Sequence, residues 1–322
     1  MQASIPYQHR PVLLAESIAL LEPNPGDLVV DGTLGGGGHA AALLERIGPA
    51  GRLVGFDVDD EALLEAGRRL GSPGDPRITL VRASFRELGR VLSDLGIARI
   101  DRLLLDLGVS SRHLDAPERG FRFSEGSAEM TPLDMRMDRR NGVTAADLLR
   151  TASAPELERM FREYGELPGA ARLARALVAQ RQIAPIRSAA DLLAVVRQAR
   201  VGGGRRHHPA TLVFQALRIA VNDELGALRE GLTAGVEALR EGGRLAVIAY
   251  HSLEDRAVKE RLREEARGCV CPPRIPVCVC GRTPRLRLLT RRPVTPSEEE
   301  VRLNPRSRSA HLRVAARLAE VA

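Results

Sequence analysis

The chain has 322 residues, of which 44% are hydrophobic and 28% are charged, close to the averages of globular proteins. This composition excludes wholesale disorder, and no apolar run approaches the roughly 18 residues that span a bilayer. Residues 1–10 lack a basic stretch followed by a long apolar one. We therefore expect no signal peptide and a cytoplasmic protein.

Basic side chains outnumber acidic ones, 48 to 41, and the net charge is +7. All but one of these cations are arginines, whose planar guanidinium groups suit phosphate. The excess favours an anionic partner only weakly, because it is spread over a long chain. Aromatic residues make up 3% and tryptophan is absent, which argues against an extended base-stacking platform.

The first third of the chain alternates short apolar runs with amphipathic stretches. Repeated βα units of this length predict a parallel sheet with right-handed crossovers. The expected strands are 28–30, 52–56, 78–81 and 101–105, and the expected helices are 40–47 and 61–70.

The pattern then changes, because residues 115–208 contain helical stretches but no convincing strand. These stretches are 143–150, 154–164, 170–182 and 188–200. A helix over 211–240, with a break near Gly226, precedes a buried strand at 244–249, and further strands are expected at 286–289 and 311–316. We therefore expect a core formed by residues 1–114 and 209–322, with a helical domain inserted at 115–208.

A glycine-rich turn, Asp31 to His39 (DGTLGGGGH), lies between the first strand and a helix. Glycines at this place let the backbone approach a ligand and point amide groups at it. Asp57 ends the next strand, at the spacing that suits ribose hydroxyls, so the pair predicts a ribose-bearing cofactor. Asp31 stands before the first glycine, and the GxGxxG spacing is absent. This favours a ligand with a free ammonium group and no pyrophosphate, such as S-adenosylmethionine.

Two more residues follow later strands. Phe85 could pack on an adenine or serve as an ordinary core residue. Asp106 ends the fourth strand, where ligand and substrate meet in open α/β sheets.

Nine segments, in order along the chain, resemble the ribosomal small subunit methyltransferase H family, also called MraW. They are YQHRPVLLAE (7–16), DGTLGGGGH (31–39), LLDLGVSS (104–111), RGF (119–121), PLDMRMD (132–138), HPAT (208–211), FQALRIAVNDEL (214–225), HSLEDR (251–256) and residues 304–313. The resemblance implies a class I, Rossmann-like methyltransferase core with an inserted helical domain. It also implies methyl transfer from S-adenosylmethionine to the N4 amine of a cytidine in the decoding region of 16S rRNA.

The same resemblance implies the site residues. Those expected to contact the cofactor are Gly37, Gly38, His39, Asp57, Phe85, Asp106 and His113, the last where the family commonly has Gln. Placement of the reactants is the main catalytic requirement, with an acceptor near the N4 hydrogens. Asp106 is the first candidate for a catalytic residue, mainly as a group that binds the cofactor and orients the amine, and His251, Ser252 and Asp134 are further candidates; the acceptor itself stays open.

The inserted domain is the expected RNA contact, since a cytidine in folded rRNA must be turned outward to react. Its basic residues are Arg119, Arg122, Arg136, Arg139, Arg140, Arg205, Arg206, His207 and His208. The alternative is a solvated basic face. Phe121 and Phe123 could stack on a base, although core packing is expected for one of them.

All 4 cysteines form two C-x-C pairs, Cys269 with Cys271 and Cys278 with Cys280. Such clustering argues against a disulfide-stapled secreted fold. Four neighbouring thiolates could bind a structural zinc ion, and the alternative is four reduced thiols in a loop.

The sequence leaves several alternatives open. The chain could methylate another RNA, a small molecule or a protein, or act as a non-enzymatic RNA-binding assembly factor. A nicotinamide-dependent oxidoreductase is disfavoured because the pyrophosphate glycine spacing is absent. The expected partner is 16S rRNA in the small ribosomal subunit, no membrane is expected, and the chain could be a monomer or a homodimer.

Overall fold

The computed structural model describes residues 11–71, 73–122, 131–202, 209–269, 271, 277 and 279–319. The chain divides into two compact units. The sheet unit consists of Met1–Gly108 and Leu225–Ala322, and the helical unit consists of Val109–Glu224. The helical unit is therefore wider at both ends than the expected range of 115–208.

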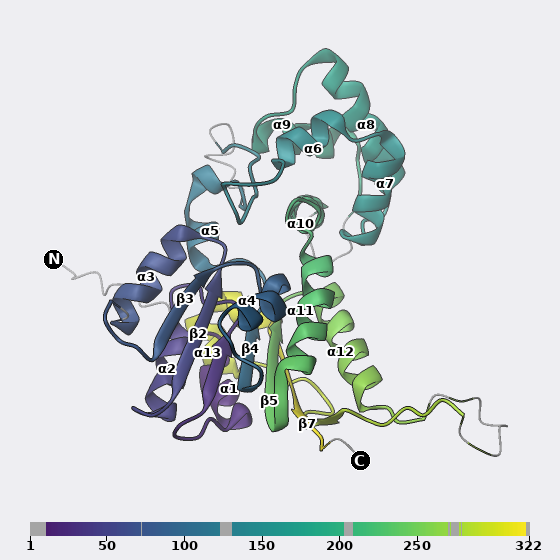
Figure 1. Ribbon diagram of the computed structural model, residues 1–322. Helices are drawn as coiled ribbons and strands as arrows, with labels where there is room; N and C mark the ends of the chain where they lie inside the picture. Colours follow the sequence, from purple (N-terminus) through teal and green to yellow (C-terminus); the bar gives the residue numbers. More distant parts are fainter. Residues whose placement is uncertain are drawn as a thin grey trace. The chain divides into compact units, whose positions relative to one another are not determined.

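A sheet of seven strands, counted over the described residues, forms the centre of the sheet unit (Figure 1). The strand order is β3-β2-β1-β4-β5-β7-β6, and only β7 runs antiparallel to its neighbours. This topology confirms the expected Rossmann-like α/β class. The strands are β1 (Leu28–Asp31), β2 (Arg52–Asp57), β3 (Ile78–Arg82), β4 (Ile100–Asp106), β5 (Leu239–Ala249), β6 (Leu286–Leu288) and β7 (His311–Arg317).

Helices cover both faces of this sheet, and each face has its own apolar core. Side chains alternate along the strands, so Leu104 and Ile248 join one core while Leu103 and Val247 join the other. One face is covered by α1 (Leu14–Leu21), α2 (Gly38–Ile47) and α3 (Asp60–Leu70); the other is covered by α4 (Leu88–Asp94), α11 (Glu224–Ala238) and α12 (Ser252–Ala266). The short elements are η1 (Phe85–Glu87), α13 (Glu298–Leu303) and η4 (Pro305–Ser309).

The helical unit has a separate core, to which α10 (Pro209–Asn222) contributes Val213, Phe214 and Leu217. This packing places α10 with the helical unit rather than with the sheet. The break between α10 and α11 falls at Asp223, whose φ is 45°, three residues before the expected break at Gly226. The other helices are α5 (Ser111–Asp115), η2 (Pro117–Arg119), α6 (Ala145–Thr151), α7 (Ala154–Glu163), α8 (Ala170–Ile183) and α9 (Ala189–Gln198).

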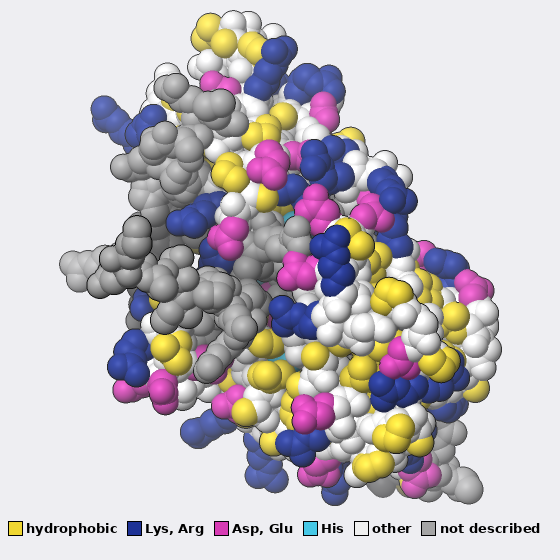
Figure 2. Space-filling view, turned by 90° about the vertical axis from the view of Figure 1, so that its left-hand side faces the viewer, with side chains coloured by type: hydrophobic (Ala, Val, Ile, Leu, Met, Phe, Trp, Pro, Cys, Tyr) yellow, Lys and Arg dark blue, Asp and Glu magenta, His cyan; other side chains and the backbone are white. Residues whose placement is uncertain are grey.

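Charges of both signs lie on the face shown in Figure 2, where Lys and Arg side chains are interspersed with Asp and Glu side chains. The net positive charge therefore does not mark this face as a binding surface. None of the helices in the described ranges is both long enough and apolar enough to cross a bilayer.

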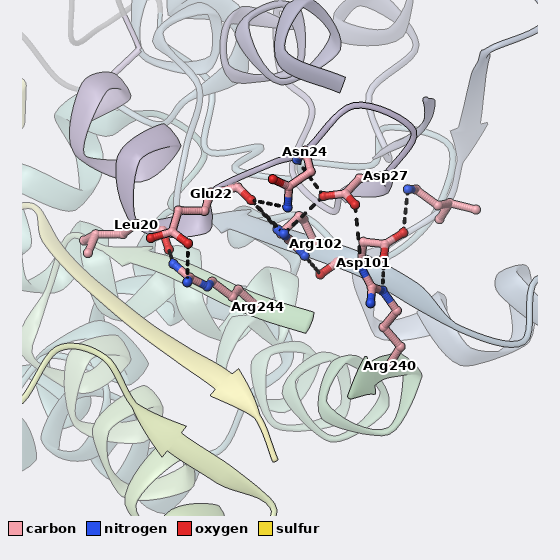
Figure 3. Close-up of polar contacts among 9 residues, drawn as sticks. Leu20, Glu22, Asn24, Asp27, Asp101, Arg102, Arg240 and Arg244 are labelled. Atoms are coloured by element: carbon pink, nitrogen blue, oxygen red, sulfur yellow. Dashed lines mark hydrogen bonds and ion pairs between the residues drawn. The ribbon is translucent and has the colours of Figure 1, made fainter. Parts of the chain in front are cut away.

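A network of charges lies at the amino ends of β1, β4 and β5 (Figure 3). At its centre Arg102, 4% exposed, approaches the Asp27 carboxylate to 3.2 Å. Arg102 also donates from Nε and Nη2 to the carbonyl of Glu22, at 3.0 and 2.7 Å. The remaining members of this amino-edge network are Asp101, Arg240 and Arg244. Arg240 forms ion pairs with Asp27 and Asp101, and Arg244 forms one with Glu22.

Candidate active site

Three carboxylates lie at the opposite, carboxyl-terminal edge of the sheet. Asp31, Asp57 and Asp106 end β1, β2 and β4. The chain leaves β1 toward β2 on one side and later returns to β4 on the other, and ligands of open α/β sheets bind at such a reversal. The Asp106 amide donates to the Thr33 hydroxyl at 2.5 Å, which joins the end of β4 to the glycine-rich turn.

The glycine-rich turn uses most of its amide groups within the chain. Gly32 donates to Leu104, Leu34 to Phe56, and Gly37 to Leu34, each through a backbone carbonyl. The amides of Thr33 and Gly35 donate to the carboxylates of Asp31 and Asp57 at 3.1 and 2.9 Å. The expectation that this turn points its amides at a ligand is therefore wrong for these five groups, since a phosphate would have to displace bonds already made.

Gly37 and Gly38 are required by the packing of the turn itself. Gly37 has a φ of 74°, and a Cβ there would lie 3.1 Å from the Cβ of Ala66. A Cβ on Gly38 would lie 2.4 Å from Cγ of Pro11, a severe clash. Contact of either glycine with a cofactor stays a prediction.

Asp57 is held in place by two amides. Its Oδ2 accepts from Gly35 and its Oδ1 accepts from Asp59, both at 2.9 Å. Each carboxylate oxygen has more than one lone pair, and the side chain remains partly exposed. Asp57 can therefore still accept hydrogen bonds from a pair of ribose hydroxyls.

Asp31 is 1% exposed, and within the described residues its Oδ2 has no hydrogen-bond partner. Burial raises the pKa of Asp31 to about 6; the charges of Asp106 and Asp57 add to the increase, while His39 and the Thr33 amide oppose it. An unpartnered buried carboxylate oxygen is costly. This part of the site therefore favours a cationic ligand group that donates hydrogen bonds.

Asp106 lies between two polar side chains. The Tyr250 hydroxyl donates to Oδ1 at 2.8 Å, and Nδ1 of His39 lies 3.5 Å from Oδ2. Burial raises the pKa of Asp106 to about 7, against the Tyr250 hydrogen bond and with help from the charge of Glu254. The carboxyl group of Asp106 thus changes its protonation state near neutral pH.

The protonation of His39 follows from its contacts. Its ring is buried, and Nε2 lies 3.1 Å from the carbonyl oxygen of Val12, which can only accept. Nε2 must therefore carry a proton. Burial lowers the pKa of His39, so the neutral ring presents the lone pair of Nδ1 to Asp106.

His251 and Ser252 lie where β5 passes into α12. His251 caps the helix, because its Nδ1 accepts from the Glu254 amide at 3.3 Å. Ser252 is exposed in the first turn. Glu254 is buried and accepts from the Tyr250 amide at 2.9 Å. The structure thus gives His251 a structural contact, and its role in catalysis stays a prediction.

The remaining expected site residues belong to the helical unit. His113 is buried, with its ring centroid 5.0 Å from that of Phe121, which is a core residue. Asp134 accepts two hydrogen bonds from Arg136, at 2.7 and 3.0 Å. Although burial opposes the change, these bonds lower the pKa of Asp134. Asp134 is therefore ionised and paired within its own unit.

The expected RNA-contacting arginines divide into two groups. Arg119 is buried and donates to the carbonyls of Arg136 and Met137, both at 3.1 Å, so its guanidinium serves the fold. The exposed members are Arg122, Arg139 and Arg140. Residues 205–208, together with Phe123 and Cys278, lie outside the described residues.

Sequence reasoning missed Tyr250 and Thr33 as site residues. Asp106 pairs with Ile248 across β4 and β5, which brings the residue two positions after Ile248 beside the Asp106 carboxylate. A tyrosine directly after a buried strand was the available signal. Thr33 lies within a motif that the sequence analysis interpreted only through its glycines.

Phe85 lies in η1, partly exposed, with its ring against α11. A Cβ on Gly231 would lie 2.4 Å from Cδ2 of this ring. Gly231→Ala is therefore expected to displace the ring and to destabilise the fold by about 1–3 kcal/mol. Calorimetry should show weaker binding of S-adenosylmethionine if Phe85 packs on adenine.

Gly89→Ala is the matched control, because its Cβ would meet the Cβ of Ala234 at an ordinary 3.7 Å. Unchanged cofactor affinity in a destabilised Gly231→Ala protein would assign Phe85 to the core alone.

Comparisons with known proteins agree with one another. The model of the MraW methylase family matches residues 6–318. The chain is 49% identical to a ribosomal RNA small subunit methyltransferase H of Heliobacterium modesticaldum and 50% identical to one of Heliobacterium mobile, over 97% of this chain and 99% of each relative. A protein of the same name from Thermomicrobium roseum is 50% identical over 97% of this chain and 94% of its own length. The chain belongs to the MraW methylase family.

Proposed function

We propose that this protein transfers a methyl group from S-adenosylmethionine to the exocyclic N4 amine of a cytidine in 16S rRNA of the small ribosomal subunit. Membership of a methylase family and the names of its relatives support methyl transfer to small-subunit rRNA. The single structural observation that carries the proposal is the carboxylate edge at Asp31, Asp57 and Asp106, with one buried oxygen unpartnered in the described chain.

The charge of this edge supports the choice of cofactor. S-adenosylmethionine carries its methyl group on a positively charged sulfur. Because of that charge, the sulfur leaves as a neutral thioether and needs no acid catalyst. Asp31 would accept hydrogen bonds from the ammonium group, and Asp57 from the ribose hydroxyls. The pyrophosphate of a nicotinamide dinucleotide would meet three carboxylates and a turn whose amides are already used.

Asp106 would orient and deprotonate the N4 amine. The N4 amine is a weak nucleophile because its lone pair is drawn into the ring, so its orientation matters. A hydrogen bond from N4 to Asp106 would aim the lone pair at the methyl group. As the N–C bond forms and the S–C bond breaks, N4 loses one proton, which the ionised carboxylate of Asp106 would accept. The hydrogen bond from Tyr250 holds that carboxylate in place.

The substrate is tested with small subunits and naked 16S rRNA from a strain that lacks this gene. Purified protein and methyl-labelled S-adenosylmethionine are added, and the digested rRNA is analysed by mass spectrometry. We expect label in N4-methylcytidine at a single position. Label in another nucleoside would overturn the N4 assignment, and label only in protein or free nucleotides would overturn the rRNA assignment. Absence of S-adenosylmethionine binding by calorimetry would overturn the whole proposal.

The pH dependence of the reaction tests the protonation states. Because Asp106 accepts only when ionised and its pKa is about 7, kcat/KM should be low in acid and rise to a plateau above about pH 7. The pKa of about 6 at Asp31 should steepen the acid limb. Initial rates on small subunits from about pH 5 to about pH 9, at low cofactor concentration, measure this limb. A flat profile would contradict the role of both carboxylates.

A further inference from the structure

The segment between α12 and β6, residues 267–285, is here called the cysteine arm. Its described positions contain neither helix nor strand, and none of them belongs to an apolar core. Val277 and Val279 are 71% and 76% exposed. In Figure 1 the coloured part of the arm leaves the sheet unit beyond the end of α12. Segments that cannot bury apolar surface are usually held by a metal or by disulfides.

The base of the arm is fastened to α12 by charged contacts. Arg285 donates to both carboxylate oxygens of Glu265 at 2.6 and 2.8 Å, and its amide donates to the carbonyl of Glu265 at 2.8 Å. Arg282 donates to the carbonyl of Glu264 at 2.9 Å. These contacts tie the returning limb of the arm to the last turn of α12.

Three cysteines meet along the two limbs of the arm. The Sγ atoms of Cys269, Cys271 and Cys280 all lie within 4.8 Å of one another. Cys269 and Cys280 are 3.8 Å apart, far beyond the roughly 2.05 Å of a disulfide bond. Zn–S bonds of about 2.3 Å in a tetrahedron place neighbouring sulfurs about 3.8 Å apart, so the distance between Cys269 and Cys280 is that of two thiolates on one zinc ion.

Backbone amides point at two of these sulfurs. The Cys271 amide donates to Sγ of Cys269, and the Val279 amide donates to Sγ of Cys271, both at 3.4 Å. Hydrogen bonds to sulfur favour the thiolate form that a metal requires. We propose that the cysteine arm binds one structural Zn²⁺ through the thiolates of Cys269, Cys271 and Cys280.

This inference does not depend on the proposed methyl transfer. Soft sulfur ligands in a tetrahedral arrangement select zinc or an iron–sulfur cluster over harder cations. Cys269 and Cys271 lie on the outgoing limb and Cys280 on the returning limb, so an ion bound by all three would join the two limbs and have a structural role. The arm should consequently be ordered by the metal, while the sheet unit keeps its own core.

The test uses the full-length protein purified under reducing conditions without chelators. Elemental mass spectrometry should find about one zinc per chain in the parent protein and in Val277→Ser, an exposed control within the same arm. Cys269→Ser, Cys271→Ser and Cys280→Ser should each lower zinc affinity by more than the roughly 10–100-fold that loss of an outer-shell partner costs. Replacement by Co²⁺ should give the visible absorption of tetrahedral cobalt and the charge-transfer bands of thiolate ligands.

Limited trypsin digestion adds a readout that does not depend on metal analysis. Removal of zinc should increase cleavage after Arg267 and Arg282, while the main thermal transition and S-adenosylmethionine binding stay unchanged. Three outcomes would overturn the proposal: zinc far below one per chain, zinc that survives all three cysteine substitutions, or an intact mass that shows a Cys269–Cys280 disulfide. Iron in place of zinc would overturn the identity of the metal.

Discussion

Asp106→Asn is expected to lower kcat by on the order of 10²–10⁴-fold, the range usual for loss of a proton-accepting group. An asparagine fits the site without rearrangement. Its oxygen can still accept from Tyr250, and its amide can donate to Nδ1 of His39, where the carboxylate now lies. Only the charge and the ability to take a proton are removed. Single-turnover rates on small subunits, with S-adenosylmethionine saturating, measure the loss.

Two controls separate chemistry from misfolding. Tyr250→Phe removes a hydrogen bond that lowers the pKa of Asp106, so the acid limb of kcat/KM should move to higher pH. In Asp106→Asn, the part of the acid limb that arises from ionisation of Asp106 should disappear. Full turnover by Asp106→Asn would show that Asp106 neither orients nor deprotonates the amine.

Asp106→Asn should also become more stable relative to the parent protein as the pH rises. The pKa of Asp106 increases from 3.8 to about 7 on folding, so its contribution to stability is complete below pH 3.8 and is lost as the pH rises through about 7. The side chain is 23% exposed, and solvent screening reduces the effect. Urea unfolding without cofactor should show Asp106→Asn gaining about 2 kcal/mol on the parent protein between pH 4 and pH 8.

Much of the sheet could be predicted, because its strands are short apolar runs that end in an acid. The runs that end at Asp31, Asp57 and Asp106 all became parallel strands. The break between α10 and α11 could not be predicted from residue types. A positive φ is uncommon for an aspartate, whereas Gly226 is buried inside α11, where packing tolerates it. The limits of the helical unit likewise depend on where the apolar face of α10 packs, which the pattern along the helix does not specify.

The candidate site was predictable to the extent that it depends on strand ends. Asp57 and Asp106 follow from the rule that ligands bind at the carboxyl edge of such sheets. The contact of Tyr250 with Asp106 depends on the register of β5 against β4, which only the structure supplies. Charge alone also misassigned Arg119, since a run of arginines does not reveal which guanidinium is buried against backbone carbonyls.

The amino-edge network accounts for the second large effect, because its central pair, Asp27 and Arg102, is buried away from water. Asp27 is 5% exposed, and Arg102 lies 3.2 Å from it. Burial lowers the pKa of Arg102, while the charges of Asp27 and Asp101 counteract this. Without Arg102, Asp27 would keep the more distant Arg240, at 3.7 Å, and the carbonyl of Glu22 would lose two donors. Removal of one partner from such a pair costs more than the pair itself contributes.

Arg102→Met is therefore expected to lower the free energy of unfolding by about 3–5 kcal/mol, measured by urea denaturation. Methionine retains a similar unbranched length, so the loss reports the charge rather than a large cavity. Arg90→Met is the matched control; Arg90 is 60% exposed and pairs with Glu87 and Asp94 on the surface, which predicts a loss below about 1 kcal/mol. The double variant Arg102→Met with Asp27→Asn should recover part of the loss, because it removes the uncompensated carboxylate. Equal losses for Arg102→Met and Arg90→Met would show that water reaches Asp27 and that the network does not stabilise the sheet.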